Sequence, residues 1–193
     1  MSSEAPRRGR LIVISGPTAS GKSTLWRRLV QRPGVRFSVS ATTRPPRPDE
    51  VDGRDYHFIS QAEFDRRVAA GDFLEWARVH GRCYGTLRSE VERALAAGSD
   101  LVLEIDVQGA MQIRDVGFPA VSIFVEPPSL EALETRLRAR GTEAEPEIQR
   151  RLAVVREELR QAPHYDHRVM NDDLERMVAE VERILGYRTE AAR

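Results

Sequence analysis

Five short hydrophobic runs punctuate the chain, and each has the length and composition of a buried β-strand. They are LIVIS (11–15), FSVS (37–40), LVLEID (101–106), VSIFVE (121–126) and HRVMN (167–171). Between and after them lie stretches with a hydrophobic residue every three or four positions, which predicts amphipathic helices. These stretches are TLWRRLVQR, SEVERALAAG, LEALETRLRARG, EIQRRLAVVREELRQA and LERMVAEVERILG. Strands alternating with helices indicate an α/β fold with a parallel five-stranded sheet flanked by helices.

Residues 41–90 interrupt this alternation. The segment contains the short alternating or aromatic runs DYHFI, FLEWARV and RCYG, with one helical stretch, AEFDRRVAAG. Ser60 and Glu63 have the S-x-x-E spacing of a capping box at the start of that helix. We predict a small antiparallel α+β subdomain inserted at 41–90. The core domain then comprises 11–40 and 91–186, and we expect residues 1–10 and 187–193 to be disordered tails.

Composition narrows the function. Charged residues make up 31% of the 193 residues and the formal net charge is zero, which argues against a general nucleic-acid binder. No hydrophobic run approaches the roughly 18 residues of a membrane span, and the N-terminus does not resemble a secretory signal. A single cysteine, Cys83, excludes an internal disulfide and fits a reducing compartment. We therefore expect a cytoplasmic protein, a monomer or small homo-oligomer, that binds neither membranes nor nucleic acid.

The first strand runs directly into GPTASGKST, which satisfies the phosphate-loop pattern G-x-x-x-x-G-K-[ST] and precedes a predicted helix. Successive N–H groups of such a loop, with the helix N-terminus, bind the phosphates of a nucleoside triphosphate. Lys22 is expected to bridge the terminal phosphates and Ser23 to offer its hydroxyl to Mg²⁺. The ATP-binding residues predicted here are Gly16, Pro17, Thr18, Ala19, Ser20, Gly21, Lys22, Ser23 and Thr24. A chance glycine-rich turn is the alternative.

Lys22 is the only lysine among the 30 Lys and Arg residues. A genome that favours arginine codons explains the arginines of the surface. It does not explain the lysine, whose compact ammonium differs in shape and phosphate geometry from a guanidinium.

A second anion site is predicted in SVSATTRPPRPDEVDGRDYHF, residues 38–58. Its prolines exclude a helix and stiffen the loop, so that Arg44 and Arg47 can converge on one phosphate. Hydroxyls of Ser40, Tyr56 and Tyr84 could complete the cage. The alternative is a solvated, arginine-rich surface loop.

The chain resembles the guanylate kinases, P-loop nucleoside monophosphate kinases that transfer a phosphoryl group from ATP to GMP. The resemblance runs from about Leu11 to Gly186. Besides the two segments above it includes FLEWA, YGT, LEIDVQGA, PPSLEAL, RLRARGTE and MNDDL, all in family order.

The resemblance implies a role for each matched residue. Ser40, Arg44, Arg47, Tyr56 and Tyr84 match contacts to the GMP phosphate, and Glu75, Thr86 and Glu104 match contacts to guanine. Asp106 belongs to the GMP site and lies near Mg²⁺, Asn171 lies beside the adenine of ATP, and Arg140 and Arg151 belong to a lid at about 137–152. The family commonly has glycine in place of Ala19, and often asparagine and tyrosine in place of Arg82 and Cys83. None of these departures removes a matched functional side chain.

The chemistry agrees with these roles. Guanine presents N1–H and N2–H donors beside an O6 acceptor, so its pocket requires carboxylates and a hydroxyl. Glu75 and Glu104 are acids within otherwise hydrophobic strands, where an unpartnered carboxylate is costly. The alternatives are that Glu75 faces water and that Glu104 pairs with an arginine.

Catalysis should consist of positioning and charge neutralisation, since the acceptor phosphate is already an anion and needs no general base. The catalytic set is Lys22, Arg44, Arg140 and Arg151, with Ser23 and Asp106 at the metal. The four histidines show no metal-ligand spacing and are interpreted as structural. The predicted substrates are ATP and GMP, with dGMP left open. Two rival interpretations are a P-loop kinase of another phosphorylated acceptor and a non-catalytic guanylate-kinase-like scaffold module.

Overall fold

The computed structural model describes residues 8–79, 81–139 and 145–187. A five-stranded sheet has the order β2-β7-β1-β8-β9, with the parallel pairs β2–β7 and β8–β9. Its strands are β1 (Leu11–Ser15), β2 (Val35–Phe37), β7 (Asp100–Glu104), β8 (Ala120–Glu126) and β9 (His167–Met170). The predicted sheet is therefore confirmed. The second strand lies earlier than predicted: it ends at Phe37, and 38–40 follow it without regular structure.

The packing divides the chain into two compact units. Among the described residues, unit 1 comprises 8–12 and 34–120, and unit 2 comprises 13–33 and 121–187, with the gaps given above.

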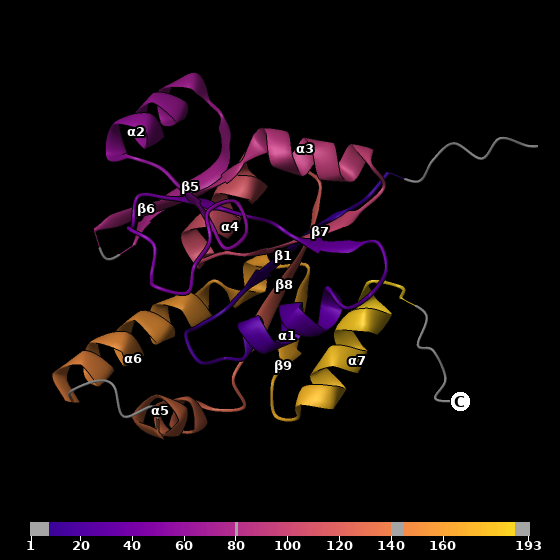
Figure 1. Ribbon diagram of the computed structural model, residues 1–193. Helices are drawn as coiled ribbons and strands as arrows, with labels where there is room; N and C mark the ends of the chain where they lie inside the picture. The colour runs from indigo at the N-terminus through magenta and orange to yellow at the C-terminus, as the bar shows by residue number, and fades with distance from the viewer. Residues whose placement is uncertain (1–7, 80, 140–144, 188–193) are drawn as a thin grey trace, which may run out of the picture. The chain divides into compact units, whose positions relative to one another are not determined.

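Unit 1 contains a second sheet, of order β4-β3-β6-β5. Its strands are β3 (Ala41–Thr42), β4 (His57–Phe58), β5 (Phe73–Val79) and β6 (Arg82–Leu87). The pairs β3–β6 and β5–β6 are antiparallel as predicted, whereas β3 and β4 pair in parallel. The helices are α2 (Gln61–Ala70), α3 (Arg88–Ala96) and α4 (Val107–Asp115). In Figure 1, α3 lies against β7.

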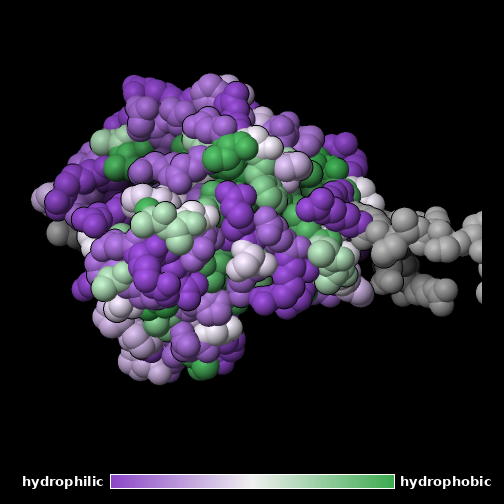
Figure 2. Space-filling view, turned by 90° about the horizontal axis from the view of Figure 1, so that it is seen from above, coloured by the Kyte–Doolittle hydropathy of each residue, from purple (hydrophilic) through white to green (hydrophobic). Residues whose placement is uncertain are grey.

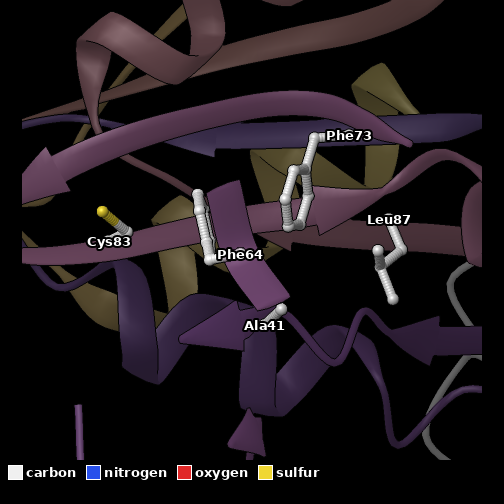
Figure 3. Packing of buried hydrophobic residues seen from close by; sticks show 5 residues of the cluster. All are labelled: Ala41, Phe64, Phe73, Cys83 and Leu87. Atoms are coloured by element: carbon white, nitrogen blue, oxygen red, sulfur yellow. The ribbon is translucent and has the colours of Figure 1, made fainter. Parts of the chain in front are cut away.

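The small sheet has a hydrophobic core of its own, made of Ala41, Phe64, Phe73, Cys83 and Leu87. Figure 3 shows these five side chains gathered from helix α2 and the strands. The Phe64 and Phe73 rings stack with centroids 4.5 Å apart, an arrangement that adds to the stability gained by burial. The core fixes α2 on the sheet that carries the predicted acceptor residues.

Two helix starts in unit 1 depend on side-chain caps. The Ser60 hydroxyl accepts from the Glu63 backbone N–H at 3.1 Å and begins α2, which confirms half of the predicted capping box. The Glu63 carboxylate accepts from Arg66 and Arg67. The Asp106 carboxylate accepts from the Gly109 backbone N–H at 2.8 Å and begins α4, a helix that the sequence pattern did not predict.

Unit 2 contains α1 (Lys22–Leu29), α5 (Leu130–Ala139), α6 (Glu145–Arg160), a 3-10 turn η1 (Ala162–His164) and α7 (Leu174–Ile184). Helices α1 and α7 lie side by side (Figure 1). Their contact combines buried hydrophobic residues with a bidentate ion pair between Arg28 and Glu175. Helices α5 and α6 share a separate hydrophobic cluster of Leu133, Leu137, Ile148, Leu152 and Val155.

Gly9, Arg10 and Tyr187 lie within the predicted tails, at their inner ends, yet the fold holds all three. The Gly9 backbone N–H donates to the Leu95 carbonyl, and the Arg10 guanidinium pairs with Asp100 at 2.6 Å. At the other end the Tyr187 backbone N–H donates to the Glu182 carbonyl. On the face shown in Figure 2, hydrophilic residues cover most of the surface and hydrophobic ones are scattered among them. Within the described residues, no helix is both long and apolar enough to cross a membrane.

Candidate functional site

The loop between β1 and α1 has three residues with positive φ. Gly16 has φ 140°, Ala19 φ 61° and Gly21 φ 101°. A Cβ at Gly16 would lie 2.3 Å from the Val125 carbonyl oxygen, so both the dihedral angle and the close strand require glycine there. Gly21 is the N-cap of α1, which directs the helix N-terminus toward the loop. The predicted strand–loop–helix arrangement of a phosphate loop is confirmed.

The single lysine bends back over this loop. Lys22 Nζ donates to the Gly16 carbonyl oxygen at 2.6 Å and to the Pro17 carbonyl oxygen at 2.8 Å. Both bonds hold the ammonium beside the backbone that is expected to bind phosphate. The next two residues, Ser23 and Thr24, are exposed on the first turn of α1.

Asn171 supports the phosphate loop from the end of β9. Its Nδ2 donates to the Ser20 carbonyl oxygen at 2.6 Å, and its backbone N–H donates to the Glu126 carbonyl oxygen at 2.8 Å. A Cβ at Gly21 would lie 2.0 Å from that Nδ2. The sequence suggested a place beside adenine, and the structure gives Asn171 a further role in holding the loop.

Residues 137–139 of the predicted lid lie on α5 and residues 145–152 on α6, whereas Arg140 falls outside the described residues. Arg151 is on α6, with Nε 3.8 Å from the Glu147 carboxylate. Arg138, which sequence reasoning did not select, pairs with Glu134 and Glu145. This pairing lowers the pKa of Glu145 to about 2. The phosphate-loop residue Ala19 packs against the cluster between the two helices.

The predicted acceptor loop lies in unit 1 and centres on Arg44. Its Nη1 and Nη2 each donate to one oxygen of Glu50, at 2.9 and 2.8 Å. The guanidinium also lies 5.5 Å from the Tyr56 ring centroid and 5.8 Å from that of Phe58. The Glu50 bond is the main cause that raises the pKa of Arg44, and the Tyr84 hydroxyl adds to it.

Other members of the predicted phosphate cage surround Arg44. Tyr56 and Tyr84 form an edge-to-face pair with centroids 6.0 Å apart, and burial raises the pKa of Tyr56. Ser40 precedes β3, and its carbonyl oxygen accepts from the His57 backbone N–H. Arg47 is exposed, and its backbone N–H donates to Glu50 at 2.8 Å. The structure thus brings Arg44, Tyr56 and Tyr84 together and places Arg47 on the same loop.

Glu75 lies on β5 and its carboxylate is buried, since the residue is only 4% exposed. The alternative that it faces water is therefore wrong; a register shift between Phe73 and Glu75 accompanies the inward position. Its Oε1 accepts from the fully buried Thr86 hydroxyl at 2.6 Å. Burial, with the nearby charge of Asp106, raises the pKa of Glu75 to about 7, against the bond from Thr86.

Helix α4 packs against the strand that carries Glu75. A Cβ at Gly109 would lie 2.4 Å from Glu75 Oε2, so the glycine leaves room for the carboxylate. The side chain of Gln112 bonds both the N–H and the carbonyl of Trp76, at 3.1 and 2.7 Å, and ties α4 to β5. Glu104 ends β7 and Asp106 caps α4, so both predicted acids lie at the carboxyl end of one strand.

Sequence reasoning did not find Glu50, Gly109 or Gln112. For Glu50 the available signal was an acid three residues after Arg47 in a loop rich in arginine. For Gly109 it was a small residue three positions after a helix-capping aspartate.

Comparison with known proteins decides the family. The family model described as "Guanylate kinase" matches residues 8–187. This chain belongs to the guanylate kinase family. Curated guanylate kinases of Symbiobacterium thermophilum and Gloeobacter violaceus are 54% and 55% identical to it, over 92% and 91% of this chain and 85% and 86% of their own lengths. A crystal structure of guanylate kinase from Anaplasma phagocytophilum superposes with a TM-score of 0.74 at 32% identity, covering 93% of this chain and 86% of that one.

The guanylate kinase family is one of transferases that phosphorylate GMP with ATP, and this is the activity of the chain. The expectation of a P-loop nucleoside monophosphate kinase is confirmed. The curated relatives argue against both rival interpretations, because they are guanylate kinases, enzymes whose acceptor is GMP.

Proposed function

We propose that the chain transfers the γ-phosphoryl group of ATP to GMP with the residues assigned above, giving ADP and GDP. The loop Gly16–Thr24 binds the triphosphate, with Lys22 neutralising charge as it develops on the transferred group. Arg140 and Arg151 of the lid add positive charge and exclude water when ATP is bound, and Asn171 lies beside the adenine. What supports this is the loop geometry, above all the Lys22 ammonium held over two loop carbonyl groups.

The acceptor occupies unit 1 in this proposal. Arg44 and Arg47, with the hydroxyls of Ser40, Tyr56 and Tyr84, bind the GMP phosphate. Because that phosphate is an anion at neutral pH, the residues have to position it and neutralise its charge, and no proton needs to be removed.

The main observation in favour of guanine as the bound base is the buried, hydrogen-bonded pair of Glu75 and Thr86. A carboxylate accepts from the two N–H donors of guanine, whereas adenine presents an acceptor at the corresponding ring nitrogen. The Thr86 hydroxyl and the Glu104 carboxylate complete the set. A mismatched base leaves buried groups unpaired, which allows strong rejection.

Mg²⁺ is the cofactor we propose. Ser23 would contribute its hydroxyl from the first turn of α1, and Asp106 would contribute its carboxylate from the N-cap of α4. These are hard oxygen donors that suit Mg²⁺, which binds few protein ligands when substrate phosphates are present. The ion would supply charge neutralisation between the phosphates.

A coupled assay tests this function, with ATP and GMP, dGMP, AMP, CMP or UMP as acceptor. We expect turnover of GMP, with kcat/KM for AMP, CMP and UMP lower by about 10² or more, and loss of GMP turnover when Mg²⁺ is chelated. Equal turnover of AMP and GMP would contradict the assignment of the base pocket. The same proposal places the enzyme in the cytoplasm, where both nucleotides occur, as a monomer or small homo-oligomer that binds neither nucleic acid nor membranes.

A further inference from the structure

The carboxylate of Glu50 lies at the centre of the acceptor loop, although it is not among the residues assigned to GMP. It accepts from Arg44 Nη1 and Nη2 at 2.9 and 2.8 Å and from the Arg47 backbone N–H at 2.8 Å. The Glu50 backbone N–H in turn donates to the Arg47 carbonyl oxygen at 3.1 Å. One side chain therefore links both arginines that are proposed to bind the phosphate.

The ion pair is better enclosed than an ordinary surface pair. The side chains of Arg44 and Glu50 are 17% and 16% exposed. The Tyr56 and Phe58 rings flank the guanidinium, and the three acceptor bonds lower the pKa of Glu50 to about 2. The carboxylate is thus ionised at neutral pH.

One edge of the guanidinium is used by neither Glu50 nor Pro45. Of its five N–H donors, two point to Glu50 and a third points to the Pro45 carbonyl oxygen at 2.8 Å. The remaining donors, Nε–H and the second Nη2–H, lie along one side of the planar group. A single anion can accept from both, in the geometry that arginine uses for phosphate. The Tyr84 hydroxyl interacts with the same guanidinium.

We propose that Glu50 is a positioning residue for the acceptor phosphate: it fixes the Arg44 fork with this side edge turned toward the phosphate and pins the turn that carries Arg47. The proposal rests on the proposed function, since it assumes that Arg44 binds GMP. Its physical content is preorganisation, in which the free enzyme already holds a rotamer-rich side chain that GMP would otherwise have to order.

Simple electrostatics gives the opposite expectation, which makes the proposal testable. A carboxylate near the binding site repels the GMP phosphate, so a neutral side chain at position 50 should strengthen GMP binding if charge alone mattered. If positioning dominates, Glu50→Gln should weaken it, because the amide presents N–H where Arg44 needs an acceptor.

The experiment measures kcat and KM for GMP and for ATP, with direct GMP binding by calorimetry, in wild type and Glu50→Gln. We expect KM and Kd for GMP to rise about tenfold, with kcat and the KM for ATP changed less than about twofold. The matched control is Glu63→Gln on α2, which removes the same charge from a carboxylate that also pairs with two arginines. It should leave all four quantities unchanged.

A second comparison tests whether Glu50 affects GMP binding through Arg44. In an Arg44→Ala background, Glu50→Gln should change the Kd for GMP by less than about twofold, because the guanidinium is gone and the amide oxygen can still accept from the Arg47 backbone N–H. Unchanged or tighter GMP binding by Glu50→Gln would overturn the proposal, as would a tenfold loss that persists without Arg44. Failure of the proposed function is a separate outcome, since wild type itself would then not phosphorylate GMP.

Discussion

The buried carboxylate of Glu75 makes the stability of the protein depend on pH in a direction opposite to that of most acids. Its pKa is about 7 in the folded chain, against about 4.5 for an ordinary glutamate, so the folded state holds the proton more tightly. Stability from this group is fully present below about pH 4.5 and is lost as the pH rises through 7. Each step of one in pKa corresponds to about 1.4 kcal/mol, which gives a total of about 3 kcal/mol.

Most of this loss of stability falls within a pH range that unfolding experiments can reach. Between pH 5 and pH 8.5, the free energy of unfolding of wild type should fall about 2.5 kcal/mol further than that of Glu75→Gln, which cannot ionise there. Urea unfolding of both proteins at a series of pH values measures the difference, and taking the difference cancels the other titrating groups.

The same group links pH to ligand binding. If guanine requires the ionised carboxylate, guanosine should inhibit about tenfold more strongly at pH 8 than at pH 6, and guanosine avoids the titration of the GMP phosphate. Unfolding curves for wild type and Glu75→Gln that run parallel across the pH range would refute this reasoning. They would mean that Glu75 gains enough from its neighbours to ionise normally.

The remaining predictions concern three residues of the site, namely Lys22, Ala19 and Gly109. Lys22→Ala should abolish phosphoryl transfer without loss of fold. Lys22→Arg should be badly impaired in steady-state assays, because a planar guanidinium does not fit over two loop carbonyl groups, and wild-type turnover by this variant would contradict the reasoning. Ala19→Gly should change the free energy of unfolding by less than about 1 kcal/mol, because glycine relieves the left-handed backbone while the methyl contact is lost. The control Ala94→Gly, within α3, should lower the free energy of unfolding clearly more. Gly109→Ala should displace the Glu75 carboxylate and lower kcat/KM for GMP about tenfold, so that the ratio of kcat/KM for GMP to kcat/KM for AMP falls. An unchanged ratio would show that the carboxylate has room to move.

The sequence predicted those features that produce a strong local pattern. The hydrophobic runs of the main sheet and the glycine-rich loop are of this kind, since burial on both faces and positive φ each restrict the residue type. Strands β3 and β4 span two residues each, too short for any periodicity, and their pairing depends on the neighbouring β6. Helix α4 contains Gly109, which lowers helix propensity, and gains stability from the bonds between Gln112 and Trp76.

The candidate site divides in the same way. Arg44 and Glu75 could be proposed from residue type, because a guanidinium in a proline-stiffened loop and an acid in a hydrophobic strand both require an explanation. Glu50 could not, because an acid in a polar loop is ordinary until the structure shows which arginine it holds. Nor does sequence reveal the distance between Gly109 and Glu75, which depends on how α4 packs against β5.

The position of Cys83 gives the protein a built-in reporter of its own opening. It is the sole cysteine of the chain and lies 1% exposed in the small core between α2 and the β3–β6–β5 strands, as Figure 3 shows. A thiol reagent can reach the sulfur only when that core opens, so the labelling rate under native conditions measures the local opening equilibrium. Because no other thiol competes, opening of the subdomain that is proposed to receive GMP can be followed alone, with and without nucleotide, in the wild-type chain without any substitution.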